Sequence, residues 1–184
     1  MAALAALARS ALVDAFEWKE RLRDGSVVVI RPIRPADLQR ETAFLSRLSP
    51  EYRAYRFIGL IKRPDEDVAR ELTCVDPARA VALVALAGDG GDDAEIGAAH
   101  YCASTGGIRC DCAVTVDPRW QQRGVGRLLM RHLIEVDRVH AADAARAGDP
   151  VRCAGAHRLA ERLGFHCRPD PEDPIVTTFE LVLH

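Results

Sequence analysis

The sequence predicts an α/β protein of the α+β kind, with a central, mostly antiparallel mixed sheet flanked by helices. Three apolar segments, 80–86, 95–101 and 109–116, follow one another with glycine-containing turns between them. This succession is typical of an antiparallel meander. Apolar residues at helical spacing come before it at 35–48 and after it at 124–140. The 184 residues are enough for one compact domain with a short appendage.

Composition and charge exclude several classes of protein. The chain is 48% hydrophobic and 28% charged, which is the composition of a globular protein. Its net charge of -2 and pI of about 6.3 lack the basic footprint of a general nucleic-acid binder. No apolar run approaches the ~20 residues that a membrane-spanning helix needs. We therefore expect no nucleic-acid or membrane partner.

The cysteines indicate the cellular location of the protein, and the N-terminal segment indicates a domain boundary. The six cysteines form no C-x-x-C pair and no cluster with histidines at zinc-finger spacing, so no metal site is expected. We expect buried, reduced thiols in a cytoplasmic protein. Residues 1–16 are rich in alanine and leucine, but Arg9 and Asp14 interrupt them, which makes a poor signal peptide. Residues 1–20 are predicted as a helical extension and residues 21–184 as the domain.

The remaining elements follow from local signals. Valines and an isoleucine at 27–30 predict a strand, and Pro35 and Asp37 favour the first turn of a helix. Further helices are expected after Ser49 and at 64–73. From 141 to 153 the strand signal fails, because charged residues, Gly148 and Pro150 break any apolar run. Toward the C-terminus we expect a helix over 156–163, a proline-rich loop over 169–174 and a strand over 175–183.

Residues 114–126 form the stretch whose pattern indicates a ligand-binding site. They read as a strand, a basic turn and a glycine-containing helix start. Helix N-termini offer unpaired backbone N–H groups and about half a positive charge, and Gly124 and Gly126 let an anion approach the backbone closely. Arginines add formal charge at positions 119, 123 and 127. The stretch predicts a pyrophosphate site, or else a helix start whose glycines serve packing and whose arginines are solvated. Neither the P-loop nor the dinucleotide fingerprint fits it.

The spacing Gln121-x-x-Gly124-x-Gly126 after an antiparallel strand resembles the acetyl-CoA signature of the GNAT acetyltransferases. The order of the elements and the closing Leu163-Gly164-Phe165 are also similar to that family, so the resemblance covers residues 22–183. It implies a GNAT-like acyltransferase fold and acetyl-CoA as cosubstrate. The implied reaction transfers acetyl directly to a primary amine.

Three shorter segments narrow the resemblance. Residues 22–37, which contain Arg31-Pro32-Ile33-Arg34-Pro35-Ala36-Asp37, look like the opening of bacterial protein-lysine acetyltransferases that modify acyl-CoA synthetases. Residues 49–57 and 170–174 resemble later blocks of the same enzymes. A protein lysine is therefore the implied acceptor. Two alternatives stay open, a small-molecule amine acetyltransferase and a catalytically weak sensor domain that binds acyl-CoA. The oligomeric state is left open.

The resemblance also assigns roles at the cofactor site. It implies that backbone groups of Val114 and Val116 pair with the pantetheine arm as an added strand would. Gln121 begins the pyrophosphate loop, and a role as a plain loop cap is equally open. The backbone amides expected to hold the pyrophosphate come from five successive residues, Arg123, Gly124, Val125, Gly126 and Arg127.

Acetyl transfer needs a base, because a protonated amine cannot attack a thioester. Related enzymes often carry a glutamate on this strand, and the matching position here is Asp111, between Cys110 and Cys112. The alternative is a strand aspartate that faces solvent or pairs with an arginine. Two positions depart from the family pattern: Ala160 replaces a common tyrosine acid, and Cys153 replaces an asparagine after the fifth strand. That strand, expected within 141–153, either survives with poor propensity or leaves the cofactor groove altered.

Overall fold

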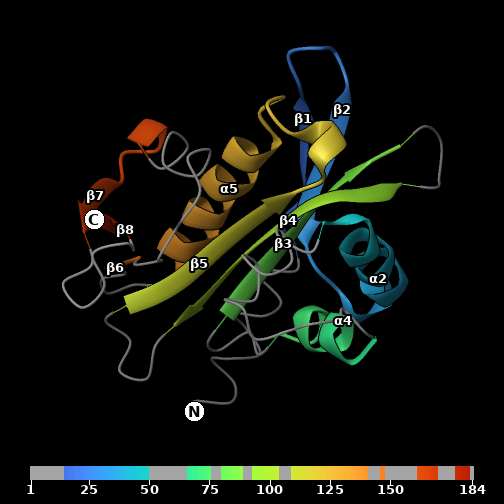
Figure 1. Cartoon of the computed structure of the whole chain (residues 1–184), viewed down its shortest axis with the longest axis horizontal. Coiled ribbons are helices and arrows are strands. Elements are labelled where there is room, and N and C mark those ends of the chain that lie inside the picture. Colours follow the sequence, from blue (N-terminus) through green and yellow to red (C-terminus); the bar gives the residue numbers. More distant parts are fainter. Residues whose placement is uncertain are drawn as a thin grey trace.

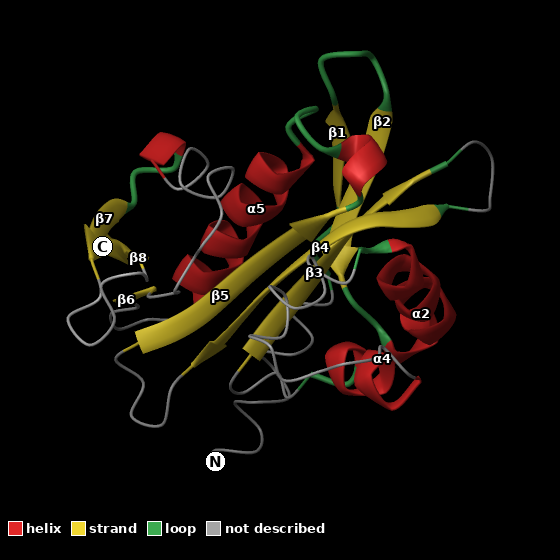
Figure 2. Ribbon diagram, in the orientation of Figure 1, coloured by secondary structure: helices red, strands yellow, loops and turns green. Residues whose placement is uncertain are grey.

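The computed structural model describes residues 15–49, 66–75, 80–88, 93–103, 109–140, 146–147, 161–169 and 177–182. Its strands form one mixed sheet in the order β1-β2-β3-β4-β5-β6-β8-β7 (Figures 1 and 2). The strands are β1 (Trp18–Arg21), β2 (Val27–Pro32), β3 (Ala80–Ala87), β4 (Ala94–Ala103), β5 (Arg109–Val116), β6 (Arg146–Ala147), β7 (His166–Pro169) and β8 (Thr177–Val182). In the part of the chain described, no helix is both long and apolar enough to span a bilayer.

The antiparallel meander predicted from the sequence is confirmed. Strands β1 to β5 pair in chain order, each antiparallel to the next. Strand β3 is the middle one of these five strands and is almost entirely buried, as its continuous apolar run predicts. The pairing of β5 with β6 is parallel, and β6, β8 and β7 continue antiparallel, so the sheet is mixed.

Helices cover both faces of the sheet (Figure 2). They are η1 (Pro35–Asp37), α2 (Leu38–Arg47), α4 (Glu66–Thr73), η2 (Pro118–Trp120) and α5 (Val125–His140). On one face, Leu129 and Leu133 of α5 pack into a core with Ala99 of β4. On the other, residues of α2 and α4 form a second core with Ala98. Adjacent strand residues point to opposite faces, so β4 has a helix layer on either side.

One close approach seats α5 on the sheet. A Cβ at Gly97 of β4 would lie 2.9 Å from the carbonyl oxygen of Thr115 and 3.2 Å from Cδ1 of Leu129. A side chain there would force the neighbouring strand or the helix outward. Gly97 therefore lets α5 lie close to β4 and β5, next to the segment that follows β5.

The segment that resembles the opening of the lysine acetyltransferases forms a buried clamp. Arg31 of β2 donates two hydrogen bonds to Asp37 of η1, both 2.7 Å long, and the Arg34 N–H donates a third of 2.9 Å. Burial raises the pKa of Asp37, but the bonds from Arg31 and Arg34 outweigh it and hold that pKa below its usual value. The clamp fixes where α2 leaves the sheet.

Part of the expected N-terminal extension belongs to the sheet. Residues 18–20, which the sequence places in a helical extension, form β1 together with Arg21 and pair with β2. His132 of α5 anchors this strand, because its ring stacks on Trp18 at 4.2 Å and hydrogen-bonds Glu20 at 2.8 Å. Residues 1–14 lie outside the described residues.

Two outcomes were left open for the strand expected within 141–153, and the structure shows the first of them. Arg146 and Ala147 form β6, so the strand survives, and the part of it that the structure describes is two residues long. Gly164, at φ 86°, ends the preceding helical turn as expected. Cys74 is a free thiol but is exposed, so the expectation of buried thiols is wrong there. The predicted helix after Ser49, the loop 170–174, and Cys153 and Ala160 lie outside the described residues.

Candidate functional site

Strand β5 has an edge that no described strand covers. It pairs with β6 only at Arg109 and Cys110, so residues 111–116 have no described partner on that side. The Asp117 N–H donates to the Ile96 carbonyl at 2.9 Å, and hydrogen bonding alternates along an antiparallel pair. The N–H and C=O groups of Val114 and Val116 therefore point away from β4, toward the uncovered edge. An extended ligand can pair with such an edge as an added strand.

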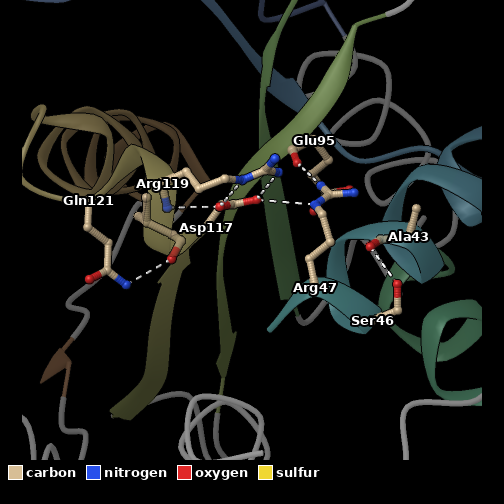
Figure 3. Close-up of polar contacts among 8 residues, drawn as sticks. Ala43, Ser46, Arg47, Glu95, Asp117, Arg119 and Gln121 are labelled. Carbon is tan, nitrogen blue, oxygen red and sulfur yellow. Dashed lines mark hydrogen bonds and ion pairs between the residues drawn. The ribbon is translucent and has the colours of Figure 1, made fainter. Parts of the chain in front are cut away.

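Gln121 closes one end of this edge. Its Nε2 donates a hydrogen bond of 3.1 Å to the carbonyl oxygen of Val116 (Figure 3). The role of loop cap, one of the two expected for this residue, is therefore present in the structure. Among the residues that the structure describes, none pairs with the N–H and C=O of Val114 or with the N–H of Val116, so a ligand can bind these groups.

The turn after β5 aims backbone N–H groups at one region. The first helical bond of α5 runs from the Leu128 N–H to the Gly124 carbonyl, at 3.1 Å. The N–H groups of Val125, Gly126 and Arg127 precede that bond and have no acceptor within the helix. With the dipole of the 16-residue helix, they form a positive end suited to a phosphate group.

Gly124 leaves space in front of these N–H groups. Its φ is 100°, a left-handed conformation that favours glycine, and a Cβ built there would meet no atom within 4 Å. The space is open, so it can admit a ligand anion close to the backbone. Together with the edge of β5, this cradle fits a chain that ends in a pyrophosphate.

The three arginines of the turn differ in their partners. Arg119 makes an ion pair with Asp117 at 2.9 Å, so its charge is already compensated and it does not add to the anion site as expected. Arg123 pairs with Asp24 of the β1–β2 turn at 3.0 Å, and its guanidinium carbon lies 4.9 Å from the Trp120 ring centroid. Arg127 is exposed. The positive field at the turn thus rests mainly on backbone groups and on Arg127.

Asp117 is the most heavily bonded side chain at the site. It is buried, and its carboxylate accepts three hydrogen bonds from Arg119 (N, Nε and Nη2) and one from Arg47 Nε (Figure 3). The hydrogen bond from the Arg119 side chain contributes most to lowering the pKa of Asp117, to about 2. The charged carboxylate caps η2, the short helix that leads into the turn.

The lowered pKa predicts an acid-sensitive contribution to stability. The folded-state pKa lies below the ordinary value, so the contribution is present above about pH 5 and is lost as the pH falls toward 2. It amounts to about 2 kcal/mol at pH 7. Asp117→Asn should remove it, so the difference in unfolding free energy between wild type and variant should shrink from pH 7 to pH 3 in urea titrations. A difference that stays constant with pH would show that the charge of Asp117 is not what stabilises the fold.

Comparisons with known proteins identify the family. The family model described as an acetyltransferase (GNAT) domain matches residues 78–167. The acetyltransferase PA5475 of Pseudomonas aeruginosa is 36% identical over 173 residues, which are 94% of this chain and 93% of the relative. The chain belongs to the GNAT acetyltransferase family.

Solved structures of acyltransferases share this fold. The GNAT domain of PAT from S. lividans superposes with a TM-score of 0.77 at 23% identity, covering 91% of this chain and 97% of that domain. The protein yncA of Salmonella typhimurium, solved with its cofactor acetyl-CoA, superposes with a TM-score of 0.60 at 21% identity. The superposition covers 85% of this chain and 93% of yncA. A cAMP-binding acyltransferase from Mycobacterium smegmatis superposes with a TM-score of 0.60 at 22% identity, and this chain covers 51% of its length.

This GNAT protein is an N-acetyltransferase with acetyl-CoA as its cosubstrate. The uncovered edge and the open turn fit that molecule, which is an extended pantetheine arm joined to a pyrophosphate. Asp111 stands opposite Cys102 in β5, within the stretch that β6 leaves uncovered. The side chain of Asp111 lies outside the described part of the structure.

Two residues that hold the turn in place, Asp117 and Arg47, were not predicted from the sequence. Asp117 lies within residues 114–126 and was given no role there, although Asp-Pro is a usual start for a short helix, with the aspartate as cap and proline in the first turn. No sequence pattern indicates a role for Arg47, because it lies 70 residues before its partner Asp117. Its place near the turn follows only from the way α2 crosses the sheet.

Proposed function

We propose that this acetyltransferase transfers acetyl from acetyl-CoA directly to the side-chain amine of a protein lysine, with no covalent enzyme intermediate. The observation that supports the use of acetyl-CoA is the uncovered edge of β5, which lies beside the N-terminus of α5. The lysine acceptor is supported by the segments at 22–37, 49–57 and 170–174 that resemble lysine acetyltransferases. The fold shared with the GNAT domain of S. lividans PAT, over nearly its whole length, is consistent with it.

In this proposal backbone groups hold the cosubstrate. The edge formed by Val114 and Val116 binds the pantetheine arm, and Gln121 keeps the end of that edge in shape. Acetyl-CoA supplies an acyl group already activated as a thioester. Five successive residues offer backbone amides to the pyrophosphate, namely Arg123, Gly124, Val125, Gly126 and Arg127.

Asp111 is the proposed general base. A lysine amine is protonated at neutral pH and must lose a proton before it can attack a carbonyl carbon. The position of Asp111 supports this role, because it lies opposite Cys102 in the stretch of β5 that β6 leaves uncovered, where we propose that the pantetheine arm binds. Because aspartate is one carbon shorter than glutamate, we propose that the proton reaches it through a water molecule.

One observation favours a second candidate, a catalytically weak sensor that binds acyl-CoA. The described part of β6 has two residues, so the described strand next to the uncovered edge of β5 is short. The sensor would bind acyl-CoA and release no free CoA. In either case we propose a cytoplasmic protein, because the cysteine pattern predicts reduced thiols.

A screen for CoA release separates these functions. The full chain is incubated with acetyl-CoA or longer acyl-CoAs and one of three acceptor classes: acyl-CoA synthetases, lysine peptides or small amines. We expect CoA release with the synthetases, and acetyl-lysine on them by mass spectrometry. Release with small amines alone would instead identify a small-molecule acetyltransferase. A thermal shift with acyl-CoA but no release in any arm would identify a sensor.

A further inference from the structure

Arg47 joins two parts of the molecule that lie on different sides of the sheet. It stands in the last turn of α2, whereas α5 covers the opposite face (Figure 1). Its Nε donates to Asp117 Oδ2 at 3.1 Å, and its Nη2 donates to the backbone carbonyl of Glu95 at 2.6 Å (Figure 3). The guanidinium therefore ties the segment after β5 to β4 and to α2.

Asp117 connects Arg47 to the turn at 121–124, which we call the cofactor turn. Its backbone N–H is bonded to Ile96 of β4, and its side chain accepts the Arg119 N–H that begins η2. Backbone and side chain of Asp117 are thus both fixed, the first directly to β4 and the second through Arg47. The direction in which η2 leaves the sheet depends on both attachments.

The turn that follows is held in an uncommon conformation. Gln122 has a φ of 62° and Gly124 a φ of 100°, and a left-handed conformation at a residue other than glycine costs free energy. Such a conformation persists only where its surroundings hold it. On the upstream side the described attachments include the Asp117 carboxylate, the bond of 2.8 Å from the Trp120 N–H to the Asp117 carbonyl and the bond from Gln121 to Val116.

We propose that Arg47 is a positioning residue for the acetyl-CoA site. Acting through Asp117, it fixes the start of the turn, so that the N–H groups of Val125, Gly126 and Arg127 are in place before the ligand arrives. Preorganisation of this kind raises affinity because less ordering is left to occur on binding. Arg47 itself does not touch the ligand. The proposal rests on the acetyl-CoA site proposed above.

Arg40 offers a matched control on the same helix. Its side chain is 39% exposed, against 30% for Arg47, and it too makes one ion pair and one bond to a backbone carbonyl. Its partners are Asp37 and the carbonyl of Asp93, neither of which belongs to the cofactor turn. Arg40→Met and Arg47→Met therefore remove similar interactions from α2, but only the second releases Asp117.

The test is the dissociation constant of acetyl-CoA, measured by calorimetry well below the unfolding midpoint of each variant. Arg47→Met should weaken binding about fivefold, the scale found for residues that act on a site indirectly. The kcat at saturating acetyl-CoA should stay unchanged. Arg40→Met should bind as wild type does. Arg47→Lys, which keeps a cation opposite Asp117, should restore most of the affinity.

The outcomes separate the two proposals. Wild type that binds no acetyl-CoA would overturn the proposed site itself. Wild type that binds, together with Arg47→Met that binds equally well, would overturn the positioning role alone. Equal weakening in Arg40→Met and Arg47→Met would also overturn it, because the effect would then come from a general loosening of α2.

Discussion

Gly124→Val is expected to abolish the stabilisation of the protein by acetyl-CoA. At a hundredfold excess over its dissociation constant, a ligand that binds only the folded state stabilises wild type by ~2.7 kcal/mol. Valine at position 124 would have to adopt a φ of 100°, and its side chain would occupy the open space in front of the helix N-terminus. A β-branched residue is strained there, and it would also hold the phosphates away from the backbone.

Gly25→Val is the control for backbone strain. Gly25 has a φ of 88°, and a Cβ there would also meet no atom within 4 Å, but it lies in the turn between β1 and β2. Both variants should lose intrinsic stability, as measured by thermal unfolding without ligand. Only the valine at position 124 should remove the thermal shift with acetyl-CoA, so Gly25→Val should keep that shift. A Gly124→Val protein that keeps the full shift would place the pyrophosphate elsewhere.

The parts of the fold that the sequence predicted are those with a strong local pattern. Strand β3 is a continuous apolar run, and its neighbours β4 and β5 follow within a few residues, so the antiparallel order needs no distant information. Helix α5 shows apolar residues at helical spacing. The clamp between Arg31 and Asp37 gave no such signal, since the proline-rich segment reads only as a strand end and a helix start.

Strand β1 was missed and strand β6 was left open, for two different physical reasons. The four residues of β1 are mostly charged and follow an alanine- and leucine-rich stretch, which favours a helix. Their place in the sheet depends on contacts of Trp18 and Glu20 with α5, far along the chain. The described part of strand β6 has two residues, and it exists through its pairing with β5 and β8 rather than through an apolar pattern.

The candidate site was predictable in its backbone and much less so in its side chains. Glycine spacing after a strand predicts unpaired amides at a helix start, and the turn at 121–124 has that geometry. Charge in a sequence does not say which acid an arginine meets. Arg47 reaches Asp117 across 70 residues, and Arg123 reaches Asp24 across 99 residues. Contacts over such separations depend on how the elements pack.

Asp111→Asn is expected to lower turnover ~10²-fold or more, the usual scale for the loss of a general base. Asparagine keeps the size of the side chain but cannot take a proton from the amine. The dissociation constant of acetyl-CoA should change little, because backbone groups of β5 and of the turn are proposed to bind it. Steady-state kinetics at pH 7 with a saturating acceptor, together with calorimetry, measure both quantities. Asp67→Asn on α4, where the carboxylate is exposed and pairs with Arg70, controls for the loss of an acid elsewhere.

The pH profile distinguishes a base from a structural residue at position 111. As the pH rises toward the pKa of the acceptor amine, more of the amine is neutral without help, so the deficit of Asp111→Asn should shrink. A purely structural defect would persist at every pH. Asp111→Glu should keep much of the activity, since it restores the residue type of the related enzymes. Wild-type turnover by Asp111→Asn at pH 7 would show that the proton leaves directly to water or through another residue, and that the carboxylate on β5 has no part in the chemistry.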